Sequence, residues 1–432
     1  MKLRILLVNP WVYDFAAFNL WSRPLGLMKV AEYLSAFDVE LGFIDCMEQS
    51  TERQYGTGKY RSVTVEKPVP LETIPRRYKR YGIPTEEFRE RLRRFLPVDL
   101  VMVTCLMTYW YPGVQEVVAT IRETARDVPV ILGGAYATLN HQHASEHSGA
   151  DLIFTGQAGK DLEFALYTFG YRLKQCRERQ PYYRLGLYGR HPFAALLTST
   201  GCPFSCSYCA SHLLSRGYRR RPPGEVLQEI MDLYTLGVRD FAFYDDALLV
   251  DFQEHLEHIL RGVIHEGISV RFHTPNGLHA RYVGEHAARL MQAANFTTIR
   301  LSLETVDMAH QQSIGDKVTI EDVERAVAVL RRCGFSRRSI GIYLMYGLPG
   351  QKIGEVREGI EFLDALDVRI NLVEFSPIRG TEAWRKLVDS GTIPDDLDPL
   401  LTNNTVFHYL HSAFDPAELE ALKLRVKELN SR

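Results

Sequence analysis

Short apolar runs alternate with helix-like patterns along the first 165 residues of the chain. The runs are continuous, without polar alternation, as expected for parallel strands that are buried on both faces. Five such runs lie at residues 3–8, 39–44, 100–104, 129–132 and 151–154, with helical patterns at 25–37 and 113–126. The pattern predicts an α/β domain over residues 1–165, built on a Rossmann-like parallel sheet.

A second alternation of the same type begins near residue 191. Its apolar runs lie at residues 194–198, 241–244, 269–273, 298–303, 339–345 and 371–375, with helical segments between them. Six consecutive βα units predict a (βα)6 partial TIM barrel over 191–400, with its active site at the carboxyl ends of the strands. We expect residues 166–190 to be a linker and 401–432 a C-terminal helical tail, with an amphipathic helix at 416–429.

Residues 48–84 interrupt the first alternation and match no regular element. They contain a Gly-Thr-Gly-Lys-Tyr run at 56–60 and a basic cluster, Arg76-Arg-Tyr-Lys-Arg80. Three interpretations are open: a solvated insertion, a loop that covers a ligand, and a patch that contacts RNA. Pro84 then begins a helix whose first turn carries Glu86 and Glu87, the charge that suits a helix N-terminus.

The composition is that of an ordinary globular protein. The 432 residues are 46% hydrophobic and 24% charged, which argues against disordered and low-complexity classes. A formal charge of -2 gives no field that would steer the chain to nucleic acid or an anionic membrane. The apolar run at 5–8 is too short for a signal segment, and the uncharged stretch 192–215 is too polar to span a membrane. We therefore expect no membrane span and a cytoplasmic, reducing setting.

Three of the seven cysteines lie within eight residues of one another. The motif is Gly201-Cys-Pro-Phe-Ser-Cys-Ser-Tyr-Cys209, with the spacing C-x3-C-x2-C. Thiolates are soft ligands that select zinc, copper(I) or iron–sulfur clusters. Three interpretations compete: buried structural cysteines, a zinc site completed by His212, and an iron–sulfur cluster held by three cysteines with one iron left open.

This motif, with others at successive strand ends, resembles the radical SAM superfamily. The other motifs are Asp245-Asp246, Asn276-Gly277, Ile299-Arg-Leu-Ser-Leu-Glu304, Gly341-Ile-Tyr-Leu-Met-Tyr-Gly-Leu-Pro-Gly350 and Ser376-Pro-Ile-Arg-Gly-Thr381. The resemblance implies that Cys202, Cys206 and Cys209 hold a 4Fe-4S cluster whose open iron chelates S-adenosylmethionine. It also implies an aromatic contact to the adenine, carboxylates at the methionine ammonium and hydroxyl contacts to the ribose. The residues that it assigns to S-adenosylmethionine are Tyr208, Asp245, Asp246, Asn276, Ser302, Glu304, Met345 and Gly347.

The first domain resembles the cobalamin-binding (B12-binding) domain that precedes the radical SAM domain in one subfamily. The match rests on Val8-Asn-Pro10, Pro24-Leu-Gly26, Val103-Thr-Cys-Leu-Met-Thr108 and Ile131-Leu-Gly-Gly134. It implies that cobalamin contacts Thr104, Thr108, Gly133 and Gly134, where glycine allows a close approach to the backbone. The alternative is an α/β cap that uses these glycines only for turns.

Several features of the first domain depart from the classical pattern. No histidine precedes His141, so the loop after the first strand cannot supply a histidine ligand to cobalt. Gly156-Gln-Ala-Gly159 replaces the Gly-Glu-Gly-Glu that is frequent at the end of this domain. The group His141, His143 and His147 is either a metal site or the solvated start of a helix. Tyr109-Trp-Tyr111 either flanks a planar ligand or packs in the core.

The resemblance implies a radical SAM enzyme that cleaves S-adenosylmethionine, and within that family a cobalamin-dependent methyltransferase acting on an unactivated carbon. One alternative is a radical SAM enzyme for ring formation, rearrangement or thiolation with a non-methylating or degenerate B12 domain. The other is a zinc- or cluster-bearing binding module without catalysis. Expected partners are a small-molecule, lipid or peptide substrate and a flavodoxin- or ferredoxin-type electron donor, whereas near-neutral charge argues against a nucleic acid. No catalytic side chain is assigned, and we expect ordinary reduced residues at Cys46, Cys105, Cys176 and Cys333.

Overall fold

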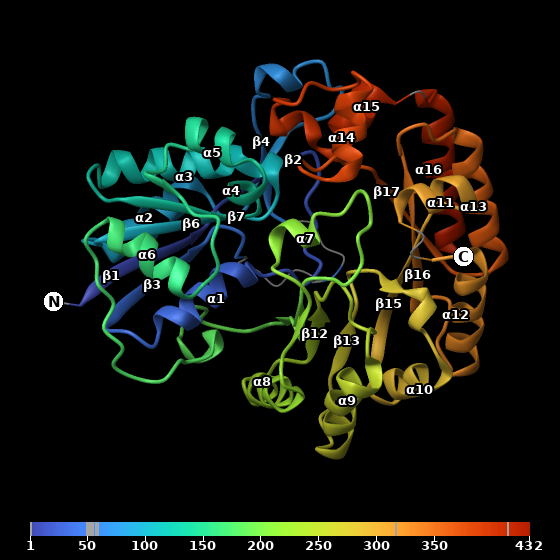
Figure 1. The fold of residues 1–432 in the computed structure, drawn as a ribbon, viewed down its shortest axis with the longest axis horizontal. Helices are drawn as coiled ribbons and strands as arrows, with labels where there is room; N and C mark the ends of the chain where they lie inside the picture. The colour runs from blue at the N-terminus through green and yellow to red at the C-terminus, as the bar shows by residue number, and fades with distance from the viewer. Residues whose placement is uncertain (1, 49–55, 57–59, 316–317, 413) are drawn as a thin grey trace. The chain divides into compact units, whose positions relative to one another are not determined.

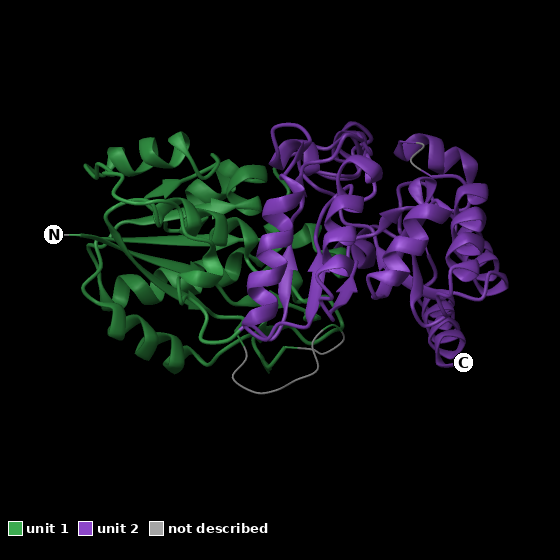
Figure 2. Cartoon of the chain, turned by 90° about the horizontal axis from the view of Figure 1, so that it is seen from below, with its two compact units in different colours: residues 1–190, 396–406 green, residues 191–395, 407–432 purple. Residues whose placement is uncertain are grey.

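The computed structural model describes residues 2–48, 56, 60–315, 318–412 and 414–432. The chain divides into two compact units, shown in different colours in Figure 2. Unit 1 comprises residues 1–190 and 396–406, and unit 2 comprises residues 191–395 and 407–432. This division differs from the expected boundaries, because the expected linker 166–190 and the start of the expected tail both belong to unit 1.

Polar contacts explain why these two segments pack in unit 1. The hydroxyl of Tyr188 donates to the buried carboxylate of Asp45 at 2.7 Å, which holds the end of the expected linker. In the other segment, Asn403 donates through Nδ2 to Asp14 at 3.1 Å. No local sequence pattern could predict either contact, because the two partners are 143 residues apart in the first and 389 residues apart in the second.

Unit 1 is built on a five-stranded parallel sheet in the order β3-β1-β6-β7-β8. Its main elements are β1 (Leu3–Asn9), α1 (Leu25–Leu34), β3 (Val39–Asp45), α2 (Thr85–Phe95), β6 (Leu100–Cys105), α3 (Tyr111–Thr124), β7 (Val130–Gly134), α4 (Ala135–Leu139), α5 (His141–His147), β8 (Leu152–Ile153) and α6 (Lys160–Thr168). Right-handed crossovers place α1 on the face opposite α2 and α3 (Figure 1). Strand order reverses between β1 and β6, the position at which sheets of this type bind ligands. The expected Rossmann-like sheet is confirmed.

A small antiparallel sheet in the order β2-β5-β4 corrects the expectation that residues 48–84 contain no regular element. Its strands are β2 (Val12–Asp14), β4 (Ser62–Thr64) and β5 (Lys79–Tyr81). Each strand has only three residues and pairs with a distant segment, so no periodicity marks it. Arg80, from the basic cluster, forms an ion pair with Glu116 at 2.6 Å, within the unit. Most of the run at 56–60 lies outside the described residues.

Unit 2 contains the six expected strands in one parallel sheet, in the order β9-β12-β13-β15-β16-β17, as expected for a partial barrel. The strands are β9 (Ala194–Leu196), β12 (Asp240–Phe243), β13 (Arg271–His273), β15 (Phe296–Glu304), β16 (Ile340–Tyr346) and β17 (Arg369–Glu374), and a short β14 (Leu278–His279) also pairs with β15. The main helices are α8 (Pro223–Thr235), α9 (Leu256–His265), α10 (Glu285–Ala293), α11 (Met308–Ile314), α12 (Ile320–Arg332), α13 (Ile353–Ala365), α14 (Glu382–Asp389) and α16 (Pro416–Ser431). Helix α15 (Asn404–His411) begins in unit 1 and ends in unit 2.

The sheet does not close, and α16 covers the exposed edge of β17 (Figure 1). The side chain of Asn430 accepts from the backbone N–H of Ile370 at 2.9 Å and donates to its carbonyl at 2.8 Å. These bonds satisfy backbone groups that an uncovered edge strand would leave unpaired. No helix among the described residues is both long and apolar enough to cross a membrane.

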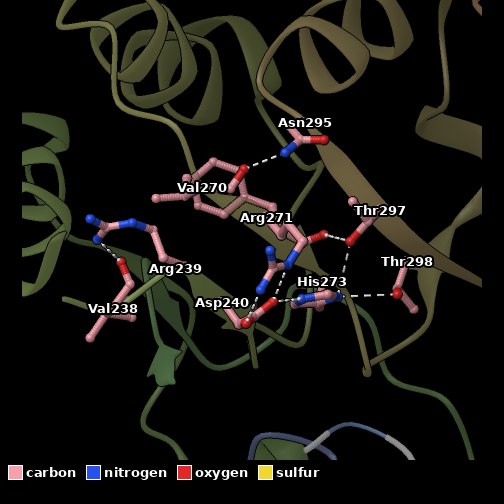
Figure 3. Close-up of polar contacts among 10 residues, drawn as sticks. Val238, Arg239, Asp240, Val270, Arg271, His273, Asn295, Thr297 and Thr298 are labelled. Carbon is pink, nitrogen blue, oxygen red and sulfur yellow. Dashed lines mark hydrogen bonds and ion pairs between the residues drawn. The ribbon is translucent and has the colours of Figure 1, made fainter. Parts of the chain in front are cut away.

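Polar side chains of β12, β13 and β15 contact one another near the first residues of β12 and β15, and His273, the last residue of the three-residue β13, also takes part (Figure 3). We call Asp240, Arg271, His273 and Thr298 the amino-end cluster. Asp240 accepts two hydrogen bonds from Arg271, at 2.7 and 2.5 Å, and lies 3.0 Å from Nε2 of the buried His273. Nδ1 of His273 lies 3.1 Å from the hydroxyl of Thr298. Burial alone would raise the pKa of Asp240, but the hydrogen bonds from His273 and Arg271 outweigh it and lower the pKa to about 2.

Candidate functional site

The three clustered cysteines lie in an irregular loop between β10 (Ser199–Thr200) and α7 (Ser211–Leu214). None of the three forms a disulfide bond; Cys206 is buried, and the other two are half-buried. Ser207 anchors the loop through both of its backbone groups. Its N–H donates to the carbonyl of Ile314 in α11 at 3.1 Å, and its carbonyl accepts from Ala383 in α14 at 2.8 Å. Three soft ligands therefore come from one loop that two helices hold in place.

Tyr208 connects the cysteine loop to the end of β15. Its hydroxyl donates to Oε1 of Glu304 at 2.8 Å. Glu304 is buried and has a φ of 69°, a conformation that residues with a Cβ rarely adopt. Burial, and then the neighbouring Glu304 carboxylate, raise the pKa of Tyr208 well above its usual value, so the phenol stays protonated and donates. Two of the expected cofactor residues are thus brought together, with the backbone strain that is typical of functional sites.

The adjacent carboxylates at 245 and 246 have different environments. Asp245 is buried, and its carboxylate accepts from the N–H and hydroxyl groups of Thr198 and Ser199, at 2.6 to 3.2 Å. Burial raises the pKa of Asp245, and these hydrogen bonds oppose the rise. Asp246 is exposed and accepts from the hydroxyl of Ser211, beside the cysteine loop, at 2.7 Å. Asp245 therefore secures β9 to the loop after β12, and Asp246 is the carboxylate that is exposed to solvent.

The other expected contacts lie at the carboxyl ends of the middle strands. Asn276 donates to the carbonyl of Tyr244 at 2.9 Å, which joins the loops after β12 and β13. Gly277 lies against the buried Ser302, and a Cβ at position 277 would be only 2.1 Å from the serine hydroxyl. The close approach therefore requires glycine at this position.

The end of β16 supplies the remaining pair, Met345 and Gly347. Gln351 donates to the carbonyl of Met345 at 3.2 Å, which folds the loop back on the strand. Gly347 has a φ of 82°, and a Cβ there would lie 2.9 Å from Nδ1 of His408. The sequence analysis did not identify His408, because it lies in the segment treated as a tail and belongs to no local motif. Burial lowers its pKa, and its ring lies edge-on to Tyr346, with centroids 5.0 Å apart.

A small pocket lies between the Tyr208–Glu304 pair and α11. Its lining residues are Tyr208, Leu303, Glu304, Gln311, Ile314 and Val318. The structure therefore places both members of the pair at the edge of a hollow, at the carboxyl end of the sheet, where sites on parallel sheets are found.

The expected cobalamin residues of unit 1 lie at the carboxyl ends of β6 and β7. Thr104 pairs with Gly133 across the two strands. The backbone requires glycine at 134, where φ is 93° and a Cβ would be 2.6 Å from the carbonyl of Cys105. Packing does not require glycine at 133, because the nearest atom to a Cβ there is the carbonyl of Phe154 at 3.7 Å. Thr108 begins the 3-10 turn Thr108–Trp110, which follows β6.

The aromatic and histidine groups of unit 1 favour the structural interpretations. Tyr109 and Tyr111 are buried, and Trp110 donates to Asp14 at 2.7 Å. Nδ1 of His143 lies 2.6 Å from the hydroxyl of Tyr136. The remaining two histidines of that group are exposed on the short helix α5. These contacts support core packing for the aromatic residues and a solvated helix start for the histidines.

The four remaining cysteines lie apart from the cysteine loop in sequence. Burial raises the thiol pKa of Cys46 and of Cys105, which makes both inert. Cys176 is exposed and Cys333 is half-buried.

Two family models match this chain. The model of the radical SAM superfamily matches residues 196–363, and the model of the B12-binding domain matches residues 77–163. The chain belongs to the radical SAM superfamily and carries a B12-binding domain. The family predicted from the motifs is confirmed, and with it the cofactor set of 4Fe-4S cluster, S-adenosylmethionine and cobalamin.

Relatives agree with this membership. An uncharacterized methyltransferase, PH0819, of Pyrococcus horikoshii is 26% identical over 198 residues, which are 45% of this chain and 41% of the relative. The hopanoid C-2 methylase of Rhodopseudomonas palustris is 24% identical over 289 residues, 62% of this chain and 54% of the relative. The matches thus span about half the length of these curated relatives. The structure of the radical S-adenosylmethionine methyltransferase TsrM from Kitasatospora setae, with cobalamin and a 4Fe-4S cluster bound, has the same fold, with a TM-score of 0.65 and 17% identity over 90% of this chain and 75% of that one.

The residues present fit all three groups. The cysteine loop offers three thiols outside disulfide bonds, the number that a cluster with one open iron requires. The Tyr208–Glu304 pair and the exposed Asp246 supply polar groups beside that loop for a zwitterionic ligand. In unit 1, the room at Gly133 permits a flat ligand to approach the backbone.

Proposed function

We propose that this protein is a cobalamin-dependent radical SAM methyltransferase that acts on an unactivated carbon. The observation that carries the proposal is the presence, in one chain, of a B12-binding domain and a radical SAM domain. The two curated relatives described above are a methylase and a methyltransferase by name, and the solved neighbour is a radical S-adenosylmethionine methyltransferase. When bound, the cluster and S-adenosylmethionine supply a carbon-centred radical and cobalamin supplies a methyl group.

The residues of the chain bind and orient these groups. Cys202, Cys206 and Cys209 hold the cluster, and the anchored backbone of Ser207 fixes their loop. Asp246 provides a negative charge for the methionine ammonium, where a charge-assisted hydrogen bond is strong. Glu304 and Ser302 provide oxygen acceptors for ribose hydroxyls. Tyr208 keeps the buried Glu304 carboxylate in one orientation by donating to it at 2.8 Å.

The first experiment tests radical chemistry. The protein is purified anaerobically, reconstituted with iron and sulfide, and incubated with S-adenosylmethionine and dithionite, and 5′-deoxyadenosine is measured. We expect wild-type protein and the control Cys176→Ala, which removes an exposed thiol, to release it, and Cys206→Ala to lose it together with its iron. If wild-type protein releases no 5′-deoxyadenosine, or if Cys206→Ala releases as much as wild type, the assignment to radical chemistry is wrong. The alternative of a zinc- or cluster-bearing binding module is then favoured.

The second experiment tests cobalamin. Gly133→Val adds a side chain where packing has room but a flat ligand would approach, so the variant should fold yet retain no corrin after loading. Gly189→Val is the matched control, because no atom lies within 4 Å of a Cβ at that position. Absence of corrin absorbance from loaded wild-type protein would contradict the methyltransferase proposal.

A third measurement separates methylation from other radical SAM reactions. S-adenosylmethionine labelled in its methyl group should pass label to the corrin fraction of the reduced, loaded protein. If 5′-deoxyadenosine is still released but the label is found only in S-adenosylmethionine and in the methionine formed by its cleavage, ring formation, rearrangement or thiolation is favoured. We further propose that a flavodoxin- or ferredoxin-type donor reduces the cluster. The substrate is a small molecule, lipid or peptide side chain rather than a nucleic acid. The protein works in the cytoplasm, where its cysteines are kept reduced.

A further inference from the structure

Three side chains with metal-ligating atoms converge where α11 and α13 begin, outside the residues assigned above to cluster and cofactors. Nδ1 of His310 lies 3.2 Å from Oδ1 of Asp307 and 3.0 Å from Oε2 of Glu355. One ligand atom from each residue lies within 4.8 Å of the other two. The side chains of His310 and Glu355 are 20% and 16% exposed, whereas that of Asp307 is 36% exposed. Solvent therefore has most access to the three residues on the side of Asp307.

The contacts to Nδ1 do not have hydrogen-bond geometry. Nδ1 of His310 and Oε2 of Glu355 are both buried atoms without a hydrogen-bond partner in the structure, although they lie 3.0 Å apart. A proton on Nδ1 would therefore not point at either oxygen. Ligands about 2.1 Å from a common metal ion lie about 3.0 to 3.4 Å from one another in octahedral or tetrahedral sites. The two separations from Nδ1 agree with a common metal position better than with a direct hydrogen bond.

Backbone groups orient all three side chains, and Oδ1 of Asp307 accepts from the N–H of His310 at 2.7 Å. Nε2 of His310 lies 3.3 Å from the carbonyl of Pro349; when Nε2 carries the proton, Nδ1 presents its lone pair. Metal-binding histidines usually donate their second nitrogen in this way. The other oxygen of Glu355, Oε1, accepts from the N–H of Lys352 at 3.1 Å, which orients Oε2 toward the histidine.

We infer that Asp307, His310 and Glu355 bind one divalent first-row transition-metal ion. Imidazole combined with carboxylates favours such ions over magnesium and calcium, which prefer oxygen ligands alone. The two carboxylates balance the charge of the ion, and water completes its coordination on the exposed side of Asp307. The ion braces α11 against α13, and α11 ends at Ile314, whose carbonyl holds Ser207 of the cysteine loop at 3.1 Å.

The test uses the full chain with its cluster reconstituted. The probe is Mn²⁺, because thiolates are poor ligands for this ion. Electron paramagnetic resonance measures the free Mn²⁺ during a titration. We expect one tight Mn²⁺ per wild-type chain and a loss of affinity of at least about tenfold in His310→Ala and in Glu355→Gln. Glu355→Gln retains an amide oxygen that can accept from Lys352, so it leaves the start of α13 intact.

His286→Ala is the matched control, because His286 is a half-exposed histidine that lies 2.8 Å from a single carboxylate, Glu257. It should bind Mn²⁺ as the wild type does. A second readout is the melting temperature, which saturating Mn²⁺ should raise in wild type and His286→Ala but not in Glu355→Gln. The inference is overturned if wild type binds no Mn²⁺ at millimolar concentration, or if Glu355→Gln binds it and is stabilised by it equally; the three residues would then form only an ion-paired cluster.

Discussion

The two ends of the sheet in unit 2 both carry polar side chains, but they use them differently. At the amino ends, Asp240 and His273 contact Arg271 and Thr298 of neighbouring strands, so the sheet itself satisfies the cluster. At the carboxyl ends, polar side chains follow the strands into loops, and Glu304 is held there at a φ of 69°. Charged side chains that pair with side chains of neighbouring strands stabilise the folded sheet. At the carboxyl ends, Asp245 is satisfied in the same way, whereas Asp246 and the strained Glu304 are the carboxylates that we propose contact the cofactors.

The largest expected effect is the loss of stability on substitution of Asp245. It tests whether a stabilising carboxylate and a ligand-binding carboxylate can be adjacent, as we propose for Asp245 and Asp246. Asp245→Ala removes the acceptor of buried donors on Thr198 and Ser199, and should lower the free energy of unfolding by about 3 kcal/mol or more. Asp246→Ala alters an exposed side chain and should change it by less than about 0.5 kcal/mol, while weakening S-adenosylmethionine binding. Urea unfolding and equilibrium binding measure the two quantities. Equal stabilities of the two variants would remove the distinction between them.

Asp240→Asn tests the amino end. The substitution removes the charge that pairs with Arg271 and His273, and the depressed pKa of about 2 corresponds to a loss of about 2 kcal/mol. Because Asp240 begins β12, at the opposite end of that strand from Asp245 and Asp246, S-adenosylmethionine affinity of the folded variant should equal that of wild type. A variant that is as stable as wild type but binds the cofactor poorly would reverse the roles of the two ends.

Acid should weaken the amino-end cluster in a defined window. The folded pKa of Asp240 lies below the ordinary value of 3.8, so its contribution is complete above about pH 4 and is lost as the pH falls toward 2. At pH 3 the stability difference between wild type and Asp240→Asn should be roughly half of that at pH 6. Urea unfolding at the two pH values measures it, and a difference that grows on acidification would contradict the assigned direction of the pKa.

The two ends also differ in how far the sequence could predict them. The cysteine motif and the strand-end motifs each occupy a few consecutive residues, so their positions, and the strands before them, could be read locally. The amino-end cluster was missed because Asp240, His273 and Thr298 belong to three separate segments that become neighbours only through strand register. His408 and the β2-β5-β4 sheet were missed for the same reason, since their partners are distant in the chain.

Adjacency limited the prediction in a different way. The sequence could place Asp245-Asp246 at a strand end, but no local pattern tells which carboxylate turns inward. That choice depends on Thr198 and Ser199, which lie 47 and 46 residues away. The motif could therefore predict the location of a cofactor contact but not which of two identical side chains makes it.

The smallest expected effect concerns Tyr208, which lies in the cysteine loop and donates a hydrogen bond to Glu304 at the end of β15. Tyr208→Phe keeps the ring and removes one hydrogen bond to the Glu304 carboxylate, which is worth about 1.5 kcal/mol or slightly more for a charged acceptor. If Tyr208 serves mainly to position Glu304, the affinity for S-adenosylmethionine should fall about tenfold, because about 1.4 kcal/mol corresponds to that factor. Cluster iron content should stay unchanged, since the cysteine loop is anchored independently through Ser207. A loss of iron with unchanged affinity would instead make Tyr208 a structural part of the loop, and the carboxyl end would then resemble the amino end at this position.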